Sequence, residues 1–133
     1  MSVILKFLKV SRYDKPHGIL LLFYPCLWGL CLINNNISDV YFLGIVFFLG
    51  ACGMRALGCI WNDYNDKKFD TLVARTKNRL IASNKVSKHQ IIVFGVINAL
   101  LGTLPLYFLP IKTVLLAFMV IPLIITYPFM KRI

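Results

Sequence analysis

The chain has 133 residues, of which 59% are hydrophobic, and it carries fifteen Lys and Arg against five acidic residues, for a net charge of +10. A soluble domain is roughly 45–50% apolar, and a soluble fold of this size leaves too much of its area in water to hide so many apolar side chains. The composition therefore argues against a soluble domain and favours a membrane protein. The cations lie at the ends of apolar runs and form no nucleic-acid-binding motif, so no nucleic-acid partner is expected.

Residues 1–17 mix apolar side chains with four cations. This pattern is too interrupted to span a bilayer, and it predicts an amphipathic helix lying at the membrane interface. Four apolar runs follow, at residues 18–33, 41–61, 90–109 and 111–129. Because a spanning helix needs about 20 residues, the sequence predicts an all-α fold, a bundle of four transmembrane helices that form a single membrane domain over residues 1–133.

The cations are distributed unevenly between the two ends of these runs. Four precede the first run, seven lie in the long connection 62–89 and two follow the last run, whereas the opposite side has only Lys112. The positive-inside rule then places the N-terminus, the long connection and the C-terminus in the cytoplasm. We therefore expect a multi-pass protein of the cell inner membrane, surrounded by lipid.

Three of the five aspartates lie close together at the expected cytoplasmic end of the second span. Asn62, Asp63, Asp66 and Asp70 are spaced by three or four residues, and on a helix such residues share one face. Carboxylate and amide oxygens are hard ligands that select Mg²⁺ or Mn²⁺ over thiophilic metals. Since Mg²⁺ takes only one or two carboxylates and shares the rest of its shell with water and phosphate, this stripe predicts a site for Mg²⁺ and a diphosphate.

Cations follow the aspartates in the same connection. Arg75 and Arg79 stand with Lys77 a few residues downstream, and an arginine fork matches phosphate oxygens in a bidentate way. Acidic groups for a metal and basic groups for a phosphate within one loop are what a diphosphate site requires. The alternative interpretation is a solvated, charged loop that only sets the membrane topology.

Arg55 lies inside the second predicted span, two helical turns deeper than Asn62 and on the same face. An intramembrane arginine costs about 2.5–3.5 kcal/mol by insertion scales, and such a residue is a functional candidate by default. It could pair with a substrate carboxylate, or it could extend to the interface or bond backbone carbonyls. Tyr127 and Lys131 end the fourth run on the side of the aspartates, where they could close over a diphosphate or serve only as interfacial anchors.

The motif Asn62-Asp63-x-x-Asp66-x-x-x-Asp70 resembles the first aspartate-rich motif of the UbiA family of intramembrane prenyltransferases. The resemblance extends over essentially the whole chain. Three further stretches carry it: Arg12-Tyr13-Asp14-Lys15-Pro16 running into Leu20-Leu21-Leu22 and Pro25, then Met54-Arg55-Ala56-x-Gly58-Cys59, then Tyr127-Pro128-Phe129-Met130-Lys131-Arg132.

This resemblance implies helices around a central cavity and a Mg²⁺-dependent transfer of a polyprenyl group from its diphosphate to 4-hydroxybenzoate, a step of ubiquinone synthesis. It implies that Asn62, Asp66 and Asp70 hold the Mg²⁺ and the diphosphate, with Asp63 beside them, and that Asp66 and Asp70 are the catalytic aspartates. Diphosphate contacts would come from Arg75, Arg79, Tyr127 and Lys131. Arg55 would meet the carboxylate of the aromatic acid.

The chain departs from the family pattern in two places. Arg75-Thr76-Lys77-Asn78-Arg79 is followed by Leu80-Ile81, without the proline that usually comes after the second arginine. No acidic residue follows Asp70, whereas the family has a second aspartate-rich motif and about twice as many helices. The chain therefore resembles the N-terminal half of the fold, and we expect it to be incomplete and inactive by itself. It could act with a separate C-terminal half, it could be a non-catalytic membrane remnant, or, on the evidence of Arg55, it could be a small transporter subunit.

Overall fold

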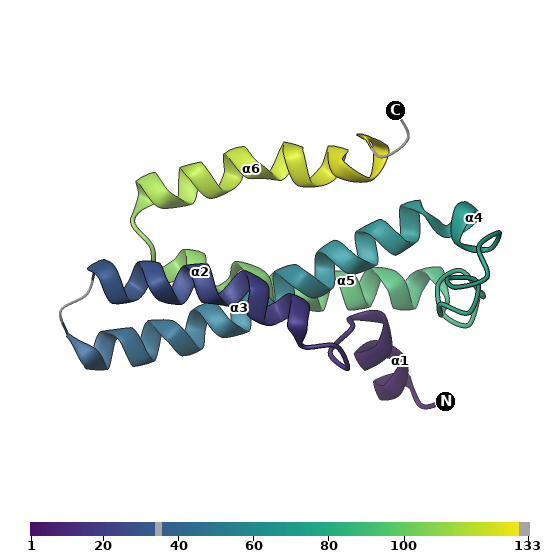
Figure 1. Cartoon of the computed structure of the whole chain (residues 1–133), viewed down its shortest axis with the longest axis horizontal. Coiled ribbons are helices and arrows are strands. Elements are labelled where there is room, and N and C mark those ends of the chain that lie inside the picture. Colours follow the sequence, from purple (N-terminus) through teal and green to yellow (C-terminus); the bar gives the residue numbers. More distant parts are fainter. Residues whose placement is uncertain (34–35, 131–133) are drawn as a thin grey trace.

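The computed structural model describes residues 1–33 and 36–130, and every regular element in these two ranges is a helix (Figure 1). The elements are α1 (Val3–Val10), α2 (His17–Ile33), α3 (Ile37–Asn65), α4 (Lys67–Asp70), α5 (Lys88–Thr103), the 3₁₀ helix η1 (Leu104–Phe108) and α6 (Ile111–Met130). Within the described residues, three segments are long and apolar enough to cross a membrane, namely Ile37–Asn65, Lys88–Phe108 and Ile111–Met130. The shorter apolar helix His17–Ile33 accompanies them. The predicted all-helical membrane bundle is thus confirmed, with one helix short of a full span.

The N-terminal helix is shorter than predicted. It covers only Val3–Val10 of the expected range 1–17 and is amphipathic, and its position at a membrane interface stays a prediction. Residues 11–14 form a turn in which Arg12 has a positive φ of 56°. A left-handed backbone at a residue other than glycine ends a right-handed helix, so α1 ends before Ser11.

Two of the spanning helices end at different places from the predicted apolar runs. Helix α3 extends beyond the run 41–61 at both ends. It starts earlier because the Asn36 side chain caps its first turn by accepting from the Ser38 amide. Helix α5 begins at a capping box in which Ser87 and Gln90 bond each other's backbone amides. The apolar run continues after α5 as the 3₁₀ helix η1 over Leu104–Phe108, since Pro105 lacks the amide donor that an α-helix needs there.

Helices α3 and α5 pack closely through glycine. A Cβ on Gly53 would lie 2.5 Å from the carbonyl oxygen of Asn98 and 2.8 Å from the Cα of Gly102. The backbones are therefore too close for any side chain at this crossing. Small residues are the usual means by which helices approach each other in lipid, where the hydrophobic effect does not drive them together.

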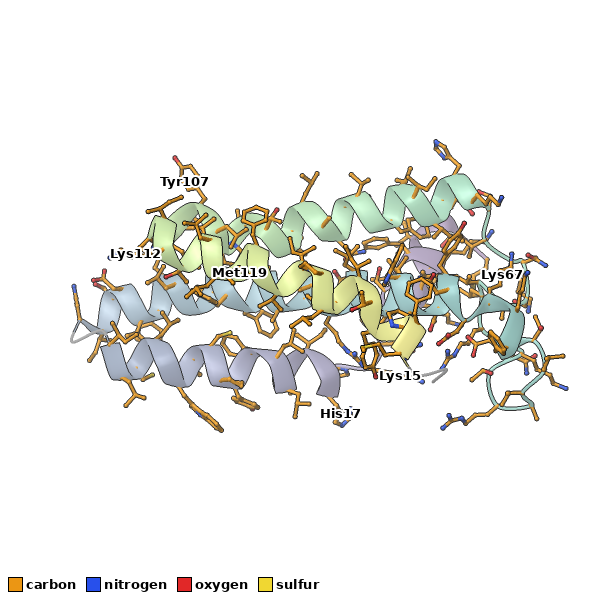
Figure 2. All side chains as sticks on the ribbon, turned by 90° about the horizontal axis from the view of Figure 1, so that it is seen from above. Lys15, His17, Lys67, Tyr107, Lys112 and Met119 are labelled. Carbon is orange, nitrogen blue, oxygen red and sulfur yellow. The ribbon has the colours of Figure 1, made fainter. Side chains whose placement is uncertain are left out.

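A cluster of buried apolar side chains lies at the end of the bundle that carries the long loop. Its members are Val10, Ile60, Ile81, Val86, Ile91 and Phe94. These residues come from α1, the end of α3, the loop and the start of α5, so the loop is folded into the protein through its apolar side chains. Figure 1 shows both ends of the described chain at this same end. In Figure 2, Lys15 and Lys67 lie toward this end, and Tyr107 and Lys112 lie toward the other.

Helix α6 stands apart from the other helices (Figure 1). Only 6% of the most apolar 18-residue segment of α6 is buried, against 44% of the corresponding segment of α3. Its contacts to α3 include the Trp61 Nε1, which donates to the Ile125 carbonyl at 3.4 Å, and Pro128 is its buried residue. Most of its apolar surface is therefore available to lipid or to further helices.

We predict that Gly53→Ala lowers the free energy of unfolding by about 1–3 kcal/mol, because the added methyl group meets the backbone of α5 rather than a side chain that can move. Unfolding of the chain in detergent by SDS, followed by circular dichroism, measures this. The matched control is Gly29→Ala in α2, where nothing lies within 4 Å of the added carbon. An equal effect of the two substitutions would contradict the proposed close packing.

Candidate functional site

The candidate site is built around the carboxylate of Asp63, in the last turn of α3. Arg12 donates from Nη2 to both of its oxygens, at 2.6 Å and 2.9 Å. Arg79 donates from Nη1 to the Asp63 Oδ1 at 3.0 Å and to the Asp70 Oδ2 at 2.9 Å. The two arginines therefore join the turn after α1, the end of α3, the end of α4 and the long loop into one ion-pair network.

Burial explains why this network needs two cations. Asp63 is 6% exposed and Asp70 is 8% exposed, and a buried carboxylate is costly unless it is paired and hydrogen-bonded. Burial opposes the charge of Arg12, but its hydrogen bond to Asp63 and the charge of that carboxylate outweigh burial and raise the pKa of Arg12. The Thr76 hydroxyl adds to the fold of the loop by donating to the Asp70 carbonyl at 3.1 Å.

The aspartates do not lie on a single helix as the spacing predicted. Helix α3 ends at Asn65, and α4 is a separate turn over Lys67–Asp70, with Asp66 at the junction between them. Asp63 and Asp70 share the guanidinium of Arg79. In the part of the chain that the structure describes, no three acidic, His or Cys side chains are placed together as a metal-binding group. The continuous stripe is therefore wrong as a geometric prediction, although the four residues remain candidates for a shared site.

Two neighbouring cavities adjoin the network. One, of about 440 Å³, is lined by Arg55 and Asn62 of α3, by Tyr127 of α6 and by Arg12. The other, of about 870 Å³, is lined by Asp63, Arg75 and Arg79 together with Lys6, Lys9, Lys15 and Lys85. The structure thus brings three of the predicted residues to one cavity and three to the next, and Arg12 lines both. Lys131 lies outside the described residues.

Arg55 reaches its cavity beside a glycine of α2. A Cβ on Gly18 would lie 2.9 Å from the Arg55 Cζ and Nη2, so the guanidinium lies directly against the backbone of α2. The Arg55 side chain is half-buried. A cation at the wall of a cavity, partly removed from water, is suited to pair with an anionic ligand group.

No sequence pattern predicted a role in the site for Arg12 or for Asn98. Asn98 is fully buried in the apolar helix α5, where its amide contacts Ser11 and Tyr13. A lone polar residue in an apolar run is the signal that could have identified it. For Arg12 the sequence holds no periodic signal, because its partner Asp63 is 51 residues away.

The apolar spanning helices define a multi-pass membrane protein, and the acid–base cluster with its two adjoining cavities is its candidate site. The model of the UbiA prenyltransferase family matches residues 22–133, and the chain belongs to this family.

The chain is 44% identical over 127 residues to a 4-hydroxybenzoate octaprenyltransferase of Shewanella loihica, covering 95% of the chain and 44% of the relative. It is 36% identical over 132 residues to the protein of the same name from a Marinomonas species, covering 99% and 46%. A mitochondrial 4-hydroxybenzoate polyprenyltransferase of Dictyostelium discoideum is 41% identical over 130 residues, covering 95% and 28%. The chain thus spans less than half the length of these relatives. No solved structure gives a significant match.

We predict that Arg79→Gln makes the loop 71–87 open more easily, by about 1–3 kcal/mol, because it leaves two buried carboxylates without the cation they share. Hydrogen exchange of the loop amides, measured by mass spectrometry, reports this opening. Lys77→Gln changes an exposed cation of the same loop and serves as the control. Equal exchange in both variants would mean that Arg79 does not hold the loop.

Proposed function

We propose that this chain supplies the site for transfer of a polyprenyl group from its diphosphate to 4-hydroxybenzoate, a step of ubiquinone synthesis. The observation that carries the proposal is the convergence of Arg55, Asn62 and Tyr127 on one cavity that adjoins the Asp63–Arg79–Asp70 network. The names of the relatives suggest 4-hydroxybenzoate as the acceptor and a polyprenyl chain as the transferred group. The cavity offers a cation for a carboxylate at its wall and phosphate-binding groups beside it.

The donor set suits a magnesium ion chemically. Asn62, Asp63, Asp66 and Asp70 offer the oxygen ligands that Mg²⁺ prefers, and one or two carboxylates suffice when a diphosphate completes the shell. When bound, Mg²⁺ would stabilise the negative charge that develops on the departing diphosphate. Arg75, Arg79, Tyr127 and Lys131 would contribute hydrogen bonds and positive charge to the same leaving group.

The acceptor would be oriented by its carboxylate. Arg55 would hold that group, leaving the electron-rich ring carbon beside the phenol free to attack the allylic carbon of the donor. As the bond between that carbon and the diphosphate oxygen breaks, the aromatic faces of Trp61 and Tyr127 would shelter the developing cation, since both residues line the cavity. Transfer of the ring proton to the departed diphosphate or to water then restores the aromatic ring. Lipid around α3 and α6 would limit the access of water to the cation.

We propose that the cation-rich end of the bundle faces the cytoplasm and that the chain resides in the inner membrane. The clustering of both ends of the described chain with the long loop supports one common side for them (Figure 1), and the positive-inside rule assigns that side.

The chain would work with further helices. The relatives are about twice as long or longer, α6 has little of its surface covered, and no acidic residue follows Asp70 in the sequence. Further helices, such as those of a C-terminal half, would supply additional carboxylates and another part of the cavity wall. The alternative is a non-catalytic membrane remnant, which would bind no prenyl diphosphate in a Mg²⁺-dependent way.

We expect Asp66→Ala to lower prenyl transfer at least about 100-fold, because it removes a group that acts on the charge of the leaving diphosphate. The assay uses membranes that hold this chain alone or together with the C-terminal half of an octaprenyltransferase relative, with Mg²⁺, 4-hydroxybenzoate and a polyprenyl diphosphate. Asp39→Ala, in the first turn of α3, is the matched control and should keep its activity. Unchanged turnover in Asp66→Ala would refute the assignment, and absence of Mg²⁺-dependent prenyl diphosphate binding in the unaltered chain would favour the remnant.

In the same assay, Arg55→Gln should raise the KM for 4-hydroxybenzoate roughly 10- to 150-fold, the factor that corresponds to loss of a hydrogen bond to a charged group. The KM for the prenyl diphosphate should rise less, because Arg75 and Arg79, which are assigned to the diphosphate, line the other cavity, whereas Asn62 and Tyr127 share the cavity of Arg55. Lys112→Gln at the opposite end of the bundle controls for loss of a cation. If the KM for the diphosphate rose more than that for 4-hydroxybenzoate, Arg55 would belong to the donor site.

A further inference from the structure

Asn98 lies in the apolar helix α5 with none of its surface exposed. Its amide group is fully engaged. The carbonyl oxygen accepts from the Tyr13 hydroxyl at 2.6 Å, and the Nδ2 donates to the Ser11 Oγ at 3.0 Å and to the Phe94 carbonyl at 2.7 Å. Two of these three bonds therefore fasten the turn after α1 to a helix that is 85 to 87 residues away in sequence.

The residue between these two anchors is Arg12. Its backbone is left-handed, with φ at 56°, a conformation that a bulky residue adopts only when its surroundings enforce it. Ser11 and Tyr13 on either side are held by the same amide, and Arg12 between them reaches the Asp63 carboxylate on α3. The direction of the Arg12 side chain thus follows from contacts made by its two neighbours.

We propose that Asn98 is a positioning residue: together with Ser11 and Tyr13 it fixes the turn that holds the Arg12 guanidinium on Asp63. This inference rests on the proposed function for its consequence, which is that Arg12 and a divalent cation compete for the same carboxylate. Both Asp63 oxygens accept from Arg12, so a cation that binds Asp63 has to displace the guanidinium or share the carboxylate with it. Arg12 lines both cavities, and Asp63 lines the larger one with it.

Tyr13→Phe tests the inference with little damage to the fold. The ring of Tyr13 packs on Phe7, with centroids 5.8 Å apart, and phenylalanine retains that contact. Burial raises the pKa of Tyr13, so the hydroxyl is protonated at neutral pH and the substitution removes a true donor to Asn98. The matched control is Tyr107→Phe, since Tyr107 is 88% exposed. Asn98→Asp is a second, isosteric variant, which replaces the Nδ2 donor to Ser11 by an acceptor.

The first readout needs no ligand. Cys59 is 4% exposed and lines the same cavity as Arg12. In a chain whose other three cysteines are replaced by alanine, the rate at which a water-soluble maleimide labels Cys59 reports whether Arg12 leaves its place. We expect Tyr13→Phe, Asn98→Asp and Arg12→Gln each to label about 2- to 10-fold faster, the range that follows from losing one hydrogen bond, and Tyr107→Phe to label at the original rate.

The double variant Tyr13→Phe with Arg12→Gln separates positioning from general loosening. If the Tyr13 hydroxyl acts through Arg12, the double variant labels no faster than Arg12→Gln alone, because residues that act through one another are not additive. The proposal would be overturned if the two single increases in labelling rate multiplied in the double variant, or if Tyr13→Phe left the labelling rate unchanged.

The second readout is Mn²⁺ binding to the full chain, measured by electron paramagnetic resonance. Release of Arg12 from Asp63 should tighten Mn²⁺ binding several-fold in Tyr13→Phe and in Arg12→Gln, whereas structural damage would weaken it. Weaker binding in Tyr13→Phe would therefore overturn the competition. If no variant and no unaltered chain binds Mn²⁺, the metal site of the proposed function fails, and the labelling rates alone still decide whether Asn98 positions Arg12.

Discussion

The structure depends on the pairing of one buried carboxylate with two arginines. Asp63 lies in the last turn of α3, the longest of the described helices, and its two partners, Arg12 and Arg79, come from segments on either side of it in the sequence. Each arginine alone is 28% to 31% exposed, so solvent weakens each pair taken singly. Together with Asp70 they form a network in which every buried charge has a partner, and that condition decides where the N-terminal turn and the long loop can lie.

The apolar core and the ion-pair network occupy the same end of the bundle. Ile81 and Val86 bury the loop against α1 and α5, while Arg79, at the start of that loop segment, holds the aspartates. Apolar contacts and ion pairs therefore both hold the long loop against the helices at this end. Elements with buried contacts open less often than exposed ones, so these contacts restrain the loop that carries part of the candidate site. Helix α6, which completes one cavity through Tyr127, is by contrast held by few contacts.

Hydropathy and charge were sufficient to predict the helices and the charged end, because bilayer thickness and the cost of burying cations act on local sequence. The spacing of the aspartates selected the right residues but the wrong local structure, since it assumed a helix that continues through Asp66, where the backbone breaks. The pairings that organise the site were outside the reach of any periodicity. Arg12 with Asp63, and Tyr13 with Asn98, join residues 51 and 85 positions apart, and only the assembled fold brings them together.

The glycine at position 18 has a consequence for how this site can change. The Arg55 guanidinium lies against Gly18 of α2, in the space that a Cβ at that position would fill, so the backbone of another helix limits where that cation can lie. Any side chain at position 18 would push the guanidinium toward the cavity and shorten the space in front of it. The position of the Arg55 guanidinium is thus set in part by a residue of α2, on a different helix from the one that carries the arginine.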